Sequence, residues 1–360
     1  MNKGKILKSP GFGETTGRKK ELKGITNHIQ SGQSVAIIAP RRFGKTALVQ
    51  QALKEVKGDL VSTVFIDLLT KSTPELLSST LIKEALKNHK LHKEFLAVRK
   101  SVGSFYTIKS LINIAAAFPF ISRLDDNSLD EWELLSKCID FPDALSLSLN
   151  QRLICAYDGF GNGANSDPGG KLLKLIYSKT SQHAGTTYIF AGHNESAVLP
   201  LKGIQVMHLG YIEKQALIKS LNKKFARLKI KLPRKYITNM VSFTKGHPYY
   251  TQLASHQTIL ANALEGIPPK SKELMNRLLA AESGYIEKVW EDLSRNKEYL
   301  HTLLALSEGS KNIYQRLKSK KINVARAQKN LEEMGYLLKN ESGGYSIADP
   351  MLELWLRKNS

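Results

Sequence analysis

The sequence contains little cysteine, no long hydrophobic run and no low-complexity tract. Only Cys138 and Cys155 are cysteines among 360 residues, and their spacing fits neither a metal site nor a disulfide framework, so a reducing cytoplasm is the expected compartment. The longest apolar stretch, Leu111 to Ile121, contains an asparagine and a proline and is much shorter than the about 20 residues that cross a bilayer. Met1 to Pro10 lacks the apolar core of a signal peptide. We therefore expect no membrane span.

Acidic residues are also few: 32 Asp and Glu stand against 53 Lys and Arg, a net charge of +21. A surface this basic attracts polyanions, of which nucleic acid is the commonest in a cytoplasm. The densest region runs from Lys214 to Lys245, with ten basic residues and no acidic one. Within it Lys219, Lys223 and Arg227 recur every fourth residue, which places them on one helical face. The pattern fits a DNA contact or, equally, a solvated helix face.

The sequence does contain a phosphate-binding loop. An apolar strand, Val35 to Ile38, precedes the loop Ala39 to Thr46, and a helix is expected to open at Ala47. The loop matches the pattern G-x-x-x-x-G-K-[ST], with Ala39 in place of the first glycine. Backbone N–H groups of such a loop surround a polyphosphate. Nucleotide contacts are therefore predicted for Ala39, Pro40, Arg41, Arg42, Phe43, Gly44, Lys45, Thr46 and Ala47.

Three loop residues have specific predicted roles. A bulky side chain at Gly44 would obstruct the phosphates. Lys45 supplies a catalytic positive charge to the β- and γ-phosphates, and the Thr46 hydroxyl is a hard oxygen ligand for Mg²⁺. The helix N-terminus adds its own partial positive charge.

Strands alternate with helices over the first 208 residues, which predicts an α/β fold with a parallel sheet covered by helices on both faces. The expected strands are 35–38, 61–66, 153–158, 187–191 and 204–208. A ligand of such a sheet binds outside the carboxyl ends of the strands. There Asp158 ends the third strand and is expected to order the Mg²⁺ shell. His193 follows the fourth strand, where a γ-phosphate sensor usually lies.

The remaining chain is predicted to be helical and to end in a winged helix. Residues 211–264 are predicted to form a helical lid. Three helices at 298–306, 313–317 and 324–334 are followed by two short strands around Asn340 to Gly344, a hairpin pattern. In a winged helix Asn323 to Glu333 would be the recognition helix. The predicted domains are 1–208 for ATP binding, 209–290 for the lid and 291–360 for the winged helix, with residues 86–145 as helical decoration.

Several motifs together resemble one family, the archaeal-type ATPases of the STAND/AAA-related P-loop group. They are APRRFGKT, TGRKKEL, YDGFGN, YIFAGHNES, GHPYYTQ and IADPMLELWLRK. The resemblance runs from Phe12 to Lys358 and is weakest between residues 86 and 145. It implies ATP with Mg²⁺, Gly17 and Arg18 near the adenine, and Pro248 as the contact of the lid with the nucleotide. It also implies that lid and winged helix move with nucleotide state.

Two departures from the family concern hydrolysis. Family members carry Asp-Glu-Phe-Gln after the third strand, where the glutamate polarises the attacking water, but here Gly159 follows Asp158. Loss of such a general base typically costs about 10²- to 10⁴-fold in rate. The arginine often found after the sensor strand is missing between Leu199 and Leu209. Glu195 or His193 could replace the lost acid, with an ordinary polar loop as the alternative.

Two hypotheses of different class follow. The first is an ATP-dependent switch with slow or partner-stimulated hydrolysis that contacts DNA through its basic lid and winged helix. The lid has 14 basic and 5 acidic residues, a net of +9, and residues 291–360 have 12 and 9, a net of +3, with Arg326, Lys329 and Lys339 as candidate phosphate contacts. The second is a hydrolysis-deficient ATP-binding scaffold whose winged helix holds a protein partner. A kinase-like transferase is disfavoured because no acceptor-binding motif is visible, and the oligomeric state stays open.

Overall fold

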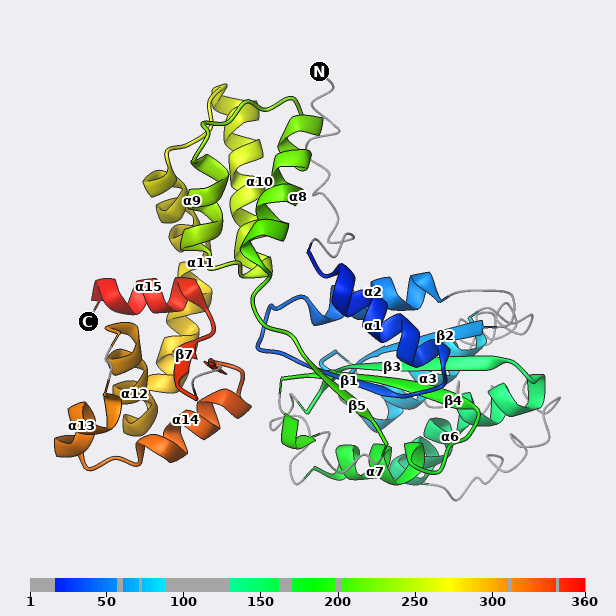
Figure 1. Ribbon diagram of the computed structural model, residues 1–360. Coiled ribbons are helices and arrows are strands. Elements are labelled where there is room, and N and C mark those ends of the chain that lie inside the picture. Colours follow the sequence, from blue (N-terminus) through cyan, green and yellow to red (C-terminus); the bar gives the residue numbers. More distant parts are fainter. Residues whose placement is uncertain are drawn as a thin grey trace. The chain divides into compact units, whose positions relative to one another are not determined.

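The computed structural model describes residues 17–56, 61–70, 73–87, 130–161, 170–193, 195–197, 203–309, 312–340 and 343–359 (Figure 1). The chain divides into two compact units. The sheet unit comprises Lys20–Ile38 and Leu48–His208, and the helical unit comprises Met1–Lys19, Ala39–Ala47 and Leu209–Ser360. The phosphate loop therefore groups with the helices that follow residue 208, although it directly continues a strand of the sheet unit in the chain.

Five parallel strands form the sheet, in the order β2-β3-β4-β1-β5. Their bounds are β1 (Val35–Ile38), β2 (Val61–Asp67), β3 (Arg152–Phe160), β4 (Thr186–Gly192) and β5 (Gln205–His208). The central strands β1 and β4 are buried along their whole length, because a parallel sheet is covered on both faces and its strands read as continuous apolar runs. The predicted α/β class is confirmed.

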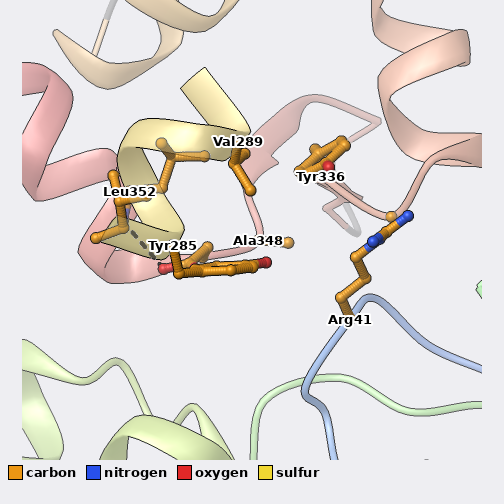
Figure 2. Close-up of a pocket in the computed structure, with 9 residues that line it drawn as sticks. Arg41, Tyr285, Val289, Tyr336, Ala348 and Leu352 are labelled. Atoms are coloured by element: carbon orange, nitrogen blue, oxygen red, sulfur yellow. Dashed lines mark hydrogen bonds between the residues drawn. The ribbon is translucent and has the colours of Figure 1, made fainter. Parts of the chain in front are cut away.

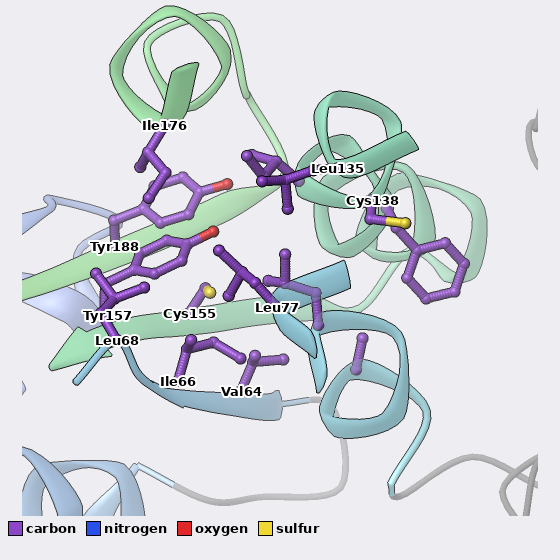
Figure 3. Close-up of a cluster of buried hydrophobic side chains, with 14 of the residues drawn as sticks. Val64, Ile66, Leu68, Leu77, Leu135, Cys138, Cys155, Tyr157, Ile176 and Tyr188 are labelled. Carbon is purple, nitrogen blue, oxygen red and sulfur yellow. The ribbon is translucent and has the colours of Figure 1, made fainter. Parts of the chain in front are cut away.

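Helices pack on both faces of this sheet. In Figure 1, α1 (Lys19–Gln30) and α2 (Lys45–Glu55) lie on one face, and α6 (Glu131–Leu149) and α7 (Lys171–Thr180) on the other. Together with α3 (Pro74–Leu86), α6 and α7 bury an apolar cluster against the strands, in which Leu77, Leu135 and Ile176 surround Cys155 and Tyr157 (Figure 3). Burying each such side chain is worth about 1.5–3 kcal/mol relative to leaving it exposed.

The helical unit has one large apolar core and a second, smaller apolar cluster. Its elements are α8 (Lys214–Arg227), α9 (Tyr236–Phe243), α10 (Pro248–Glu265), α11 (Ser271–Ser294), α12 (Lys297–Ser307), α13 (Ile313–Leu317), α14 (Val324–Glu333), β6 (Leu337–Lys339), β7 (Tyr345–Ile347) and α15 (Pro350–Asn359). The core extends from Ile212 to Leu356 and includes side chains from α8, α11 and α15. The domain boundary expected at residue 290 lies within α11. Three helices followed by the antiparallel pair β6 and β7 give the element order of a winged helix.

Two local predictions need correction. Helix α2 begins at Lys45 rather than Ala47, which places Lys45 and Thr46 in its first turn. Strand β3 continues two residues past Asp158, because the pairing with β4 shifts register between Asp158 and Phe160 and accommodates one extra residue, Gly159. Of the region 86–145, α6 begins at Glu131, and residues 88–129 lie outside the described part. Among the described residues, no helix is both long and apolar enough to span a bilayer.

Candidate functional site

The phosphate loop has the backbone that an anion-binding loop needs. Gly44 has φ +83°, in the left-handed region that favours glycine, and a Cβ built there would meet no atom within 4 Å. The space beside this glycine is therefore open to a ligand. The loop leads into the N-terminus of α2, an 11-residue helix whose first N–H groups have no partner within the helix. These residues fit a polyphosphate.

The Lys45 side chain is buried and turned back across the loop. Its ammonium group donates to the carbonyl oxygens of Ala39, at 2.7 Å, and Pro40, at 2.8 Å. These contacts hold the ammonium group against the backbone of the loop.

Arg42 ties the loop to the helices of the helical unit. Its guanidinium pairs with the Glu282 carboxylate on α11 and lies over two rings, with its central carbon 4.5 Å from the Tyr249 centroid and 3.6 Å from that of Tyr285. The carboxylate is only 7% exposed and also accepts a 2.6 Å hydrogen bond from the Tyr249 hydroxyl. Burial lowers the pKa of Arg42, but the hydrogen bond to Glu282 and the electrostatic interactions with Tyr250, Tyr285 and Glu282 together raise it by more, so the guanidinium stays charged. Arg42 also has φ +63°, a left-handed conformation that costs a non-glycine residue about 1–2 kcal/mol.

The residues on either side of Arg42 contact the same unit. Phe43 is 1% exposed, with its ring 4.6 Å from that of His247 and 5.4 Å from that of Tyr211. Arg41 lies over the Tyr336 ring, 5.5 Å from its centroid, at the edge of a small pocket (Figure 2). That pocket is lined by Tyr285, Ile286, Val289, Gly335, Tyr336, Ala348, Asp349 and Leu352 and has room for about one water molecule. It is thus too small for a nucleotide.

The GHPYY motif supplies the opposite side of these contacts. His247 caps α10 by accepting the Tyr250 N–H at its Nδ1, at 3.5 Å, and Pro248 is the first residue of the helix. Burial, with Arg42 and Arg18 nearby, lowers the pKa of His247 to about 3. The imidazole is therefore neutral near pH 7.

Successive tyrosines of that motif reach in two directions. Tyr249 bonds Glu282, beside the loop, and the Tyr250 hydroxyl donates to Asp349, at 2.7 Å, just before α15. Burial raises the pKa of Asp349, whose carboxylate also accepts two backbone N–H groups at the start of α15. One helical turn therefore connects the phosphate loop to the C-terminal helix.

Gly17 and Arg18 lie against the segment that precedes α8. A Cβ on Gly17, which has φ +81°, would come within 2.4 Å of the Ile212 side chain, so only glycine fits there. Arg18 is 5% exposed and its guanidinium donates to the Gly210 carbonyl. Gly246, with φ +76°, is restricted in the same way, because a Cβ there would lie 2.5 Å from the Ile212 carbonyl oxygen. These residues brace the segment between β5 and α8.

The carboxyl ends of the strands carry the other predicted site residues, in the sheet unit. Asp158 is 7% exposed and pairs in register with Asp67 at the end of β2. One Asp67 oxygen accepts the Leu69 N–H at 3.0 Å. His193 follows β4, and the Glu195 carboxylate lies 3.5 Å from the His208 imidazole. Among the described residues, no group of three His, Cys, Asp or Glu side chains could hold a metal.

Gly159 has a structural reason to be glycine. Its φ is +80°, and a Cβ there would lie 2.8 Å from Leu69 Cγ and 3.4 Å from the Leu69 backbone nitrogen. A glutamate at this position would therefore require both a strained backbone and displacement of the β2 turn.

The structure thus gathers Gly17, Arg18, the loop residues 39–47 and Pro248 in the helical unit, whereas Asp158 and His193 belong to the sheet unit. Phe12, Thr16 and Asn194 of the family motifs lie outside the described residues. Sequence reasoning missed Glu282, Tyr285 and Asp67. The paired strand endings FID and AYD could have indicated Asp67, but nothing local in the sequence indicates that Glu282 faces Arg42.

Comparisons with known proteins bear on the fold. Neither protein-family models nor curated protein sequences match the chain. Among solved structures, a Walker-type ATPase of Pyrococcus abyssi is similar over 95% of this chain and 96% of its own, with a TM-score of 0.67 and 19% identity. The ORC1 protein of Aeropyrum pernix, solved in complex with DNA, covers 98% and 96% with a TM-score of 0.52 and 14% identity. The ORC2 protein of Aeropyrum pernix in its ADP form covers 96% and 94%, with a TM-score of 0.50 and 13% identity. The chain therefore has the fold of archaeal P-loop ATPases along its whole length.

Proposed function

We propose that this chain is an ATP-binding P-loop NTPase that acts as a nucleotide-dependent switch, with slow or partner-stimulated hydrolysis. The fold, the open glycine position at Gly44 and the buried Lys45 ammonium group support nucleotide binding. Mg²⁺ would be held by the Thr46 hydroxyl and the Asp158 carboxylate, and it would neutralise phosphate charge when bound. Gly17, Arg18 and Pro248 are the proposed contacts with the rest of the nucleotide, and His193 the proposed γ-phosphate sensor.

The observation that carries the switch is the contact of Arg42 with Glu282. A guanidinium pairs as well with phosphate as with carboxylate, so a polyphosphate in the loop competes with Glu282 for Arg42. Because Tyr249 and Tyr285 hold the same guanidinium, its release loosens α10 and α11 at the loop. Nucleotide binding at the loop therefore changes the helical unit.

Gly159 supports slow hydrolysis, because no acidic residue directly follows Asp158. Its left-handed backbone and its contact with Leu69 favour glycine at this position. The second candidate, a hydrolysis-deficient scaffold whose C-terminal region binds a protein partner, rests on the same observation. In both candidates the protein binds ATP, belongs to the STAND/AAA-related group and is cytoplasmic.

DNA is the proposed partner of the first candidate, contacted through the basic lid and winged helix. The net charges of +9 and +3 in these regions support it, and a structural neighbour was solved with DNA.

Single-turnover hydrolysis of labelled ATP by excess protein with Mg²⁺ tests the function, with Lys45→Ala as the matched control. We expect slow cleavage by the wild type that rises with duplex DNA and disappears in the variant. ATP that is bound but never cleaved, with or without DNA, selects the scaffold. Absence of ATP binding by the wild type contradicts both candidates.

A further inference from the structure

An exposed cationic surface of the helical unit lies on α8 and the connection to α9. It consists of eight exposed side chains, which we call the α8 basic surface: Lys214, Lys219, Lys223, Arg227, Lys229, Lys231, Arg234 and Lys235. Within the described residues, none of these eight side chains forms an ion pair or a side-chain hydrogen bond, whereas cations elsewhere in the unit, such as Lys245, Arg277 and Arg357, have carboxylate partners.

The fold directs this surface away from the core. Leu217, Leu221 and Phe225 are the buried residues of α8. Each central cation follows one of them by two positions, which is about 200° around the helix. Lys219, Lys223 and Arg227 therefore form a stripe on the opposite side, with about 6 Å of helix rise between neighbours. The stripe carries charge along one line, as a nucleic-acid backbone does.

The predicted recognition helix of the winged helix lacks such a surface. On α14, Arg326 pairs with Glu298 through two hydrogen bonds of 2.6 and 3.1 Å, and Lys329 lies 4.0 Å from Glu333. From Asn323 to Glu333 two basic residues are balanced by two acidic ones, a net charge of zero. Phosphate attraction there is correspondingly weak.

We propose that the α8 basic surface, and not the recognition helix α14, is the main contact of this protein with the sugar–phosphate backbone of duplex DNA. This inference rests on the DNA contact of the proposed function and assigns it to a surface. Cations that touch only phosphates position a protein without reading sequence. Binding is therefore independent of DNA sequence and strongly dependent on salt.

The chemistry of the surface disfavours an anionic membrane as the partner. A helix that binds a bilayer surface inserts an apolar face between the lipid headgroups. The apolar face of α8 is already buried in the core of the helical unit, as Leu217, Leu221 and Phe225 show. The α8 basic surface therefore fits a polyanion that binds through its charges alone, as duplex DNA does.

Two triple variants with the same change in charge test the assignment. The lid triple is Lys219→Glu, Lys223→Glu and Arg227→Glu, and the winged-helix triple is Lys320→Glu, Lys329→Glu and Lys339→Glu. All six residues are exposed, so both triples should keep the thermal midpoint of the wild type. The readout is fluorescence anisotropy with two duplexes of unrelated sequence, each titrated at several salt concentrations.

We expect the lid triple to lose about tenfold or more in affinity for both duplexes. The slope of log affinity against log salt concentration should become shallower by about 2.7, which is three phosphate contacts at about 0.9 each. The winged-helix triple should retain affinity within about threefold. An equal or larger loss in the winged-helix triple overturns the proposal, as does wild-type binding to phosphatidylserine vesicles but not to DNA. If the wild type binds MgATP but no duplex at any salt, the DNA part of the proposed function fails together with this inference, while the nucleotide switch stands.

Discussion

The guanidinium of Arg42, in the phosphate loop, is hydrogen-bonded to the carboxylate of Glu282, on α11, and stacks on the rings of Tyr249 and Tyr285. This places a residue of the loop in direct contact with the helices that follow the sheet. In the proposed switch, a nucleotide phosphate and Glu282 are alternative partners for this cation, and their competition would couple ligand binding to those helices.

The Arg42–Glu282 pair should show energetic coupling in a double-mutant cycle. With Arg42→Gln and Glu282→Gln, we expect a coupling free energy of unfolding of about 1–3 kcal/mol, because the carboxylate is buried and each single variant leaves a partner unsatisfied. Urea unfolding measures it. Arg277 and Glu273, a more accessible pair on the same helix with side chains 31% and 48% exposed, serve as the control cycle and should show much weaker coupling. Additive single variants at Arg42 and Glu282 would contradict the interaction.

Gly159→Glu should destabilise the protein rather than restore hydrolysis. The left-handed backbone and the contact with Leu69 predict a loss of about 1–3 kcal/mol in the free energy of unfolding. Gly284→Ala is the control, because Gly284 is exposed within α11 with open space around it and the exchange should stabilise the helix by about 1 kcal/mol. A Gly159→Glu variant of wild-type stability with faster ATP turnover would show that the position accepts the acid.

His247 should make the folded state sensitive to acid. Its pKa is about 3 in the folded state against an ordinary 6.5, so the unfolded chain binds more protons between these values and stability falls as pH falls. Between pH 7 and pH 5 this contributes a loss of about 2 kcal/mol. Asp349, whose pKa is raised, acts in the opposite direction, so the comparison must be between variants.

The measurement for His247 is urea unfolding of the wild type and His247→Asn at pH 7 and pH 5. Asparagine can still cap α10 but does not titrate. The wild type should lose about 2 kcal/mol more than the variant over this range. Identical pH dependence in the wild type and His247→Asn would refute the assignment.

Much of the sheet could be predicted from the sequence, because buried parallel strands are short apolar runs with clear ends. Strand β1 has the predicted bounds, and α3 begins at the local signal of a Thr73 cap followed by Pro74. The bulge at Gly159 could not be predicted, since it depends on the register of β3 against β4. The start of α2 was wrong by two residues, because helix ends carry weak local signals.

The candidate site was only partly visible in the sequence. The phosphate loop is a contiguous motif with fixed spacing, so each of its residues could be named. The partners of Arg42 come from residues 249, 282 and 285, and a contact between residues 240 positions apart depends on tertiary packing alone. The GHPYYTQ motif contributed to the family resemblance, but it did not indicate that its two tyrosines reach different partners.

Asp158 should be needed for the effect of Mg²⁺ on ATP binding. We expect Asp158→Asn to remove most of the difference between ATP affinities measured with Mg²⁺ and with EDTA, because its carboxylate is the proposed oxygen ligand of the ion. Asp67→Asn is the matched control, one strand away in register, where the carboxylate caps its own turn. It should keep the Mg²⁺ dependence. Loss of the Mg²⁺ dependence in both variants, or in Asp67→Asn alone, would contradict the assignment of the Mg²⁺ ligand to Asp158 and indicate Asp67.

The most direct test of the switch is the dissociation constant of MgATP for Glu282→Gln, measured by calorimetry beside the wild type. If Glu282 competes with phosphate for Arg42, the variant should bind MgATP about tenfold more tightly, equivalent to about 1.4 kcal/mol. Lys45→Ala should abolish binding, and Glu287→Gln, exposed on the same helix, should leave it unchanged. Unchanged or weaker binding by Glu282→Gln would contradict the account.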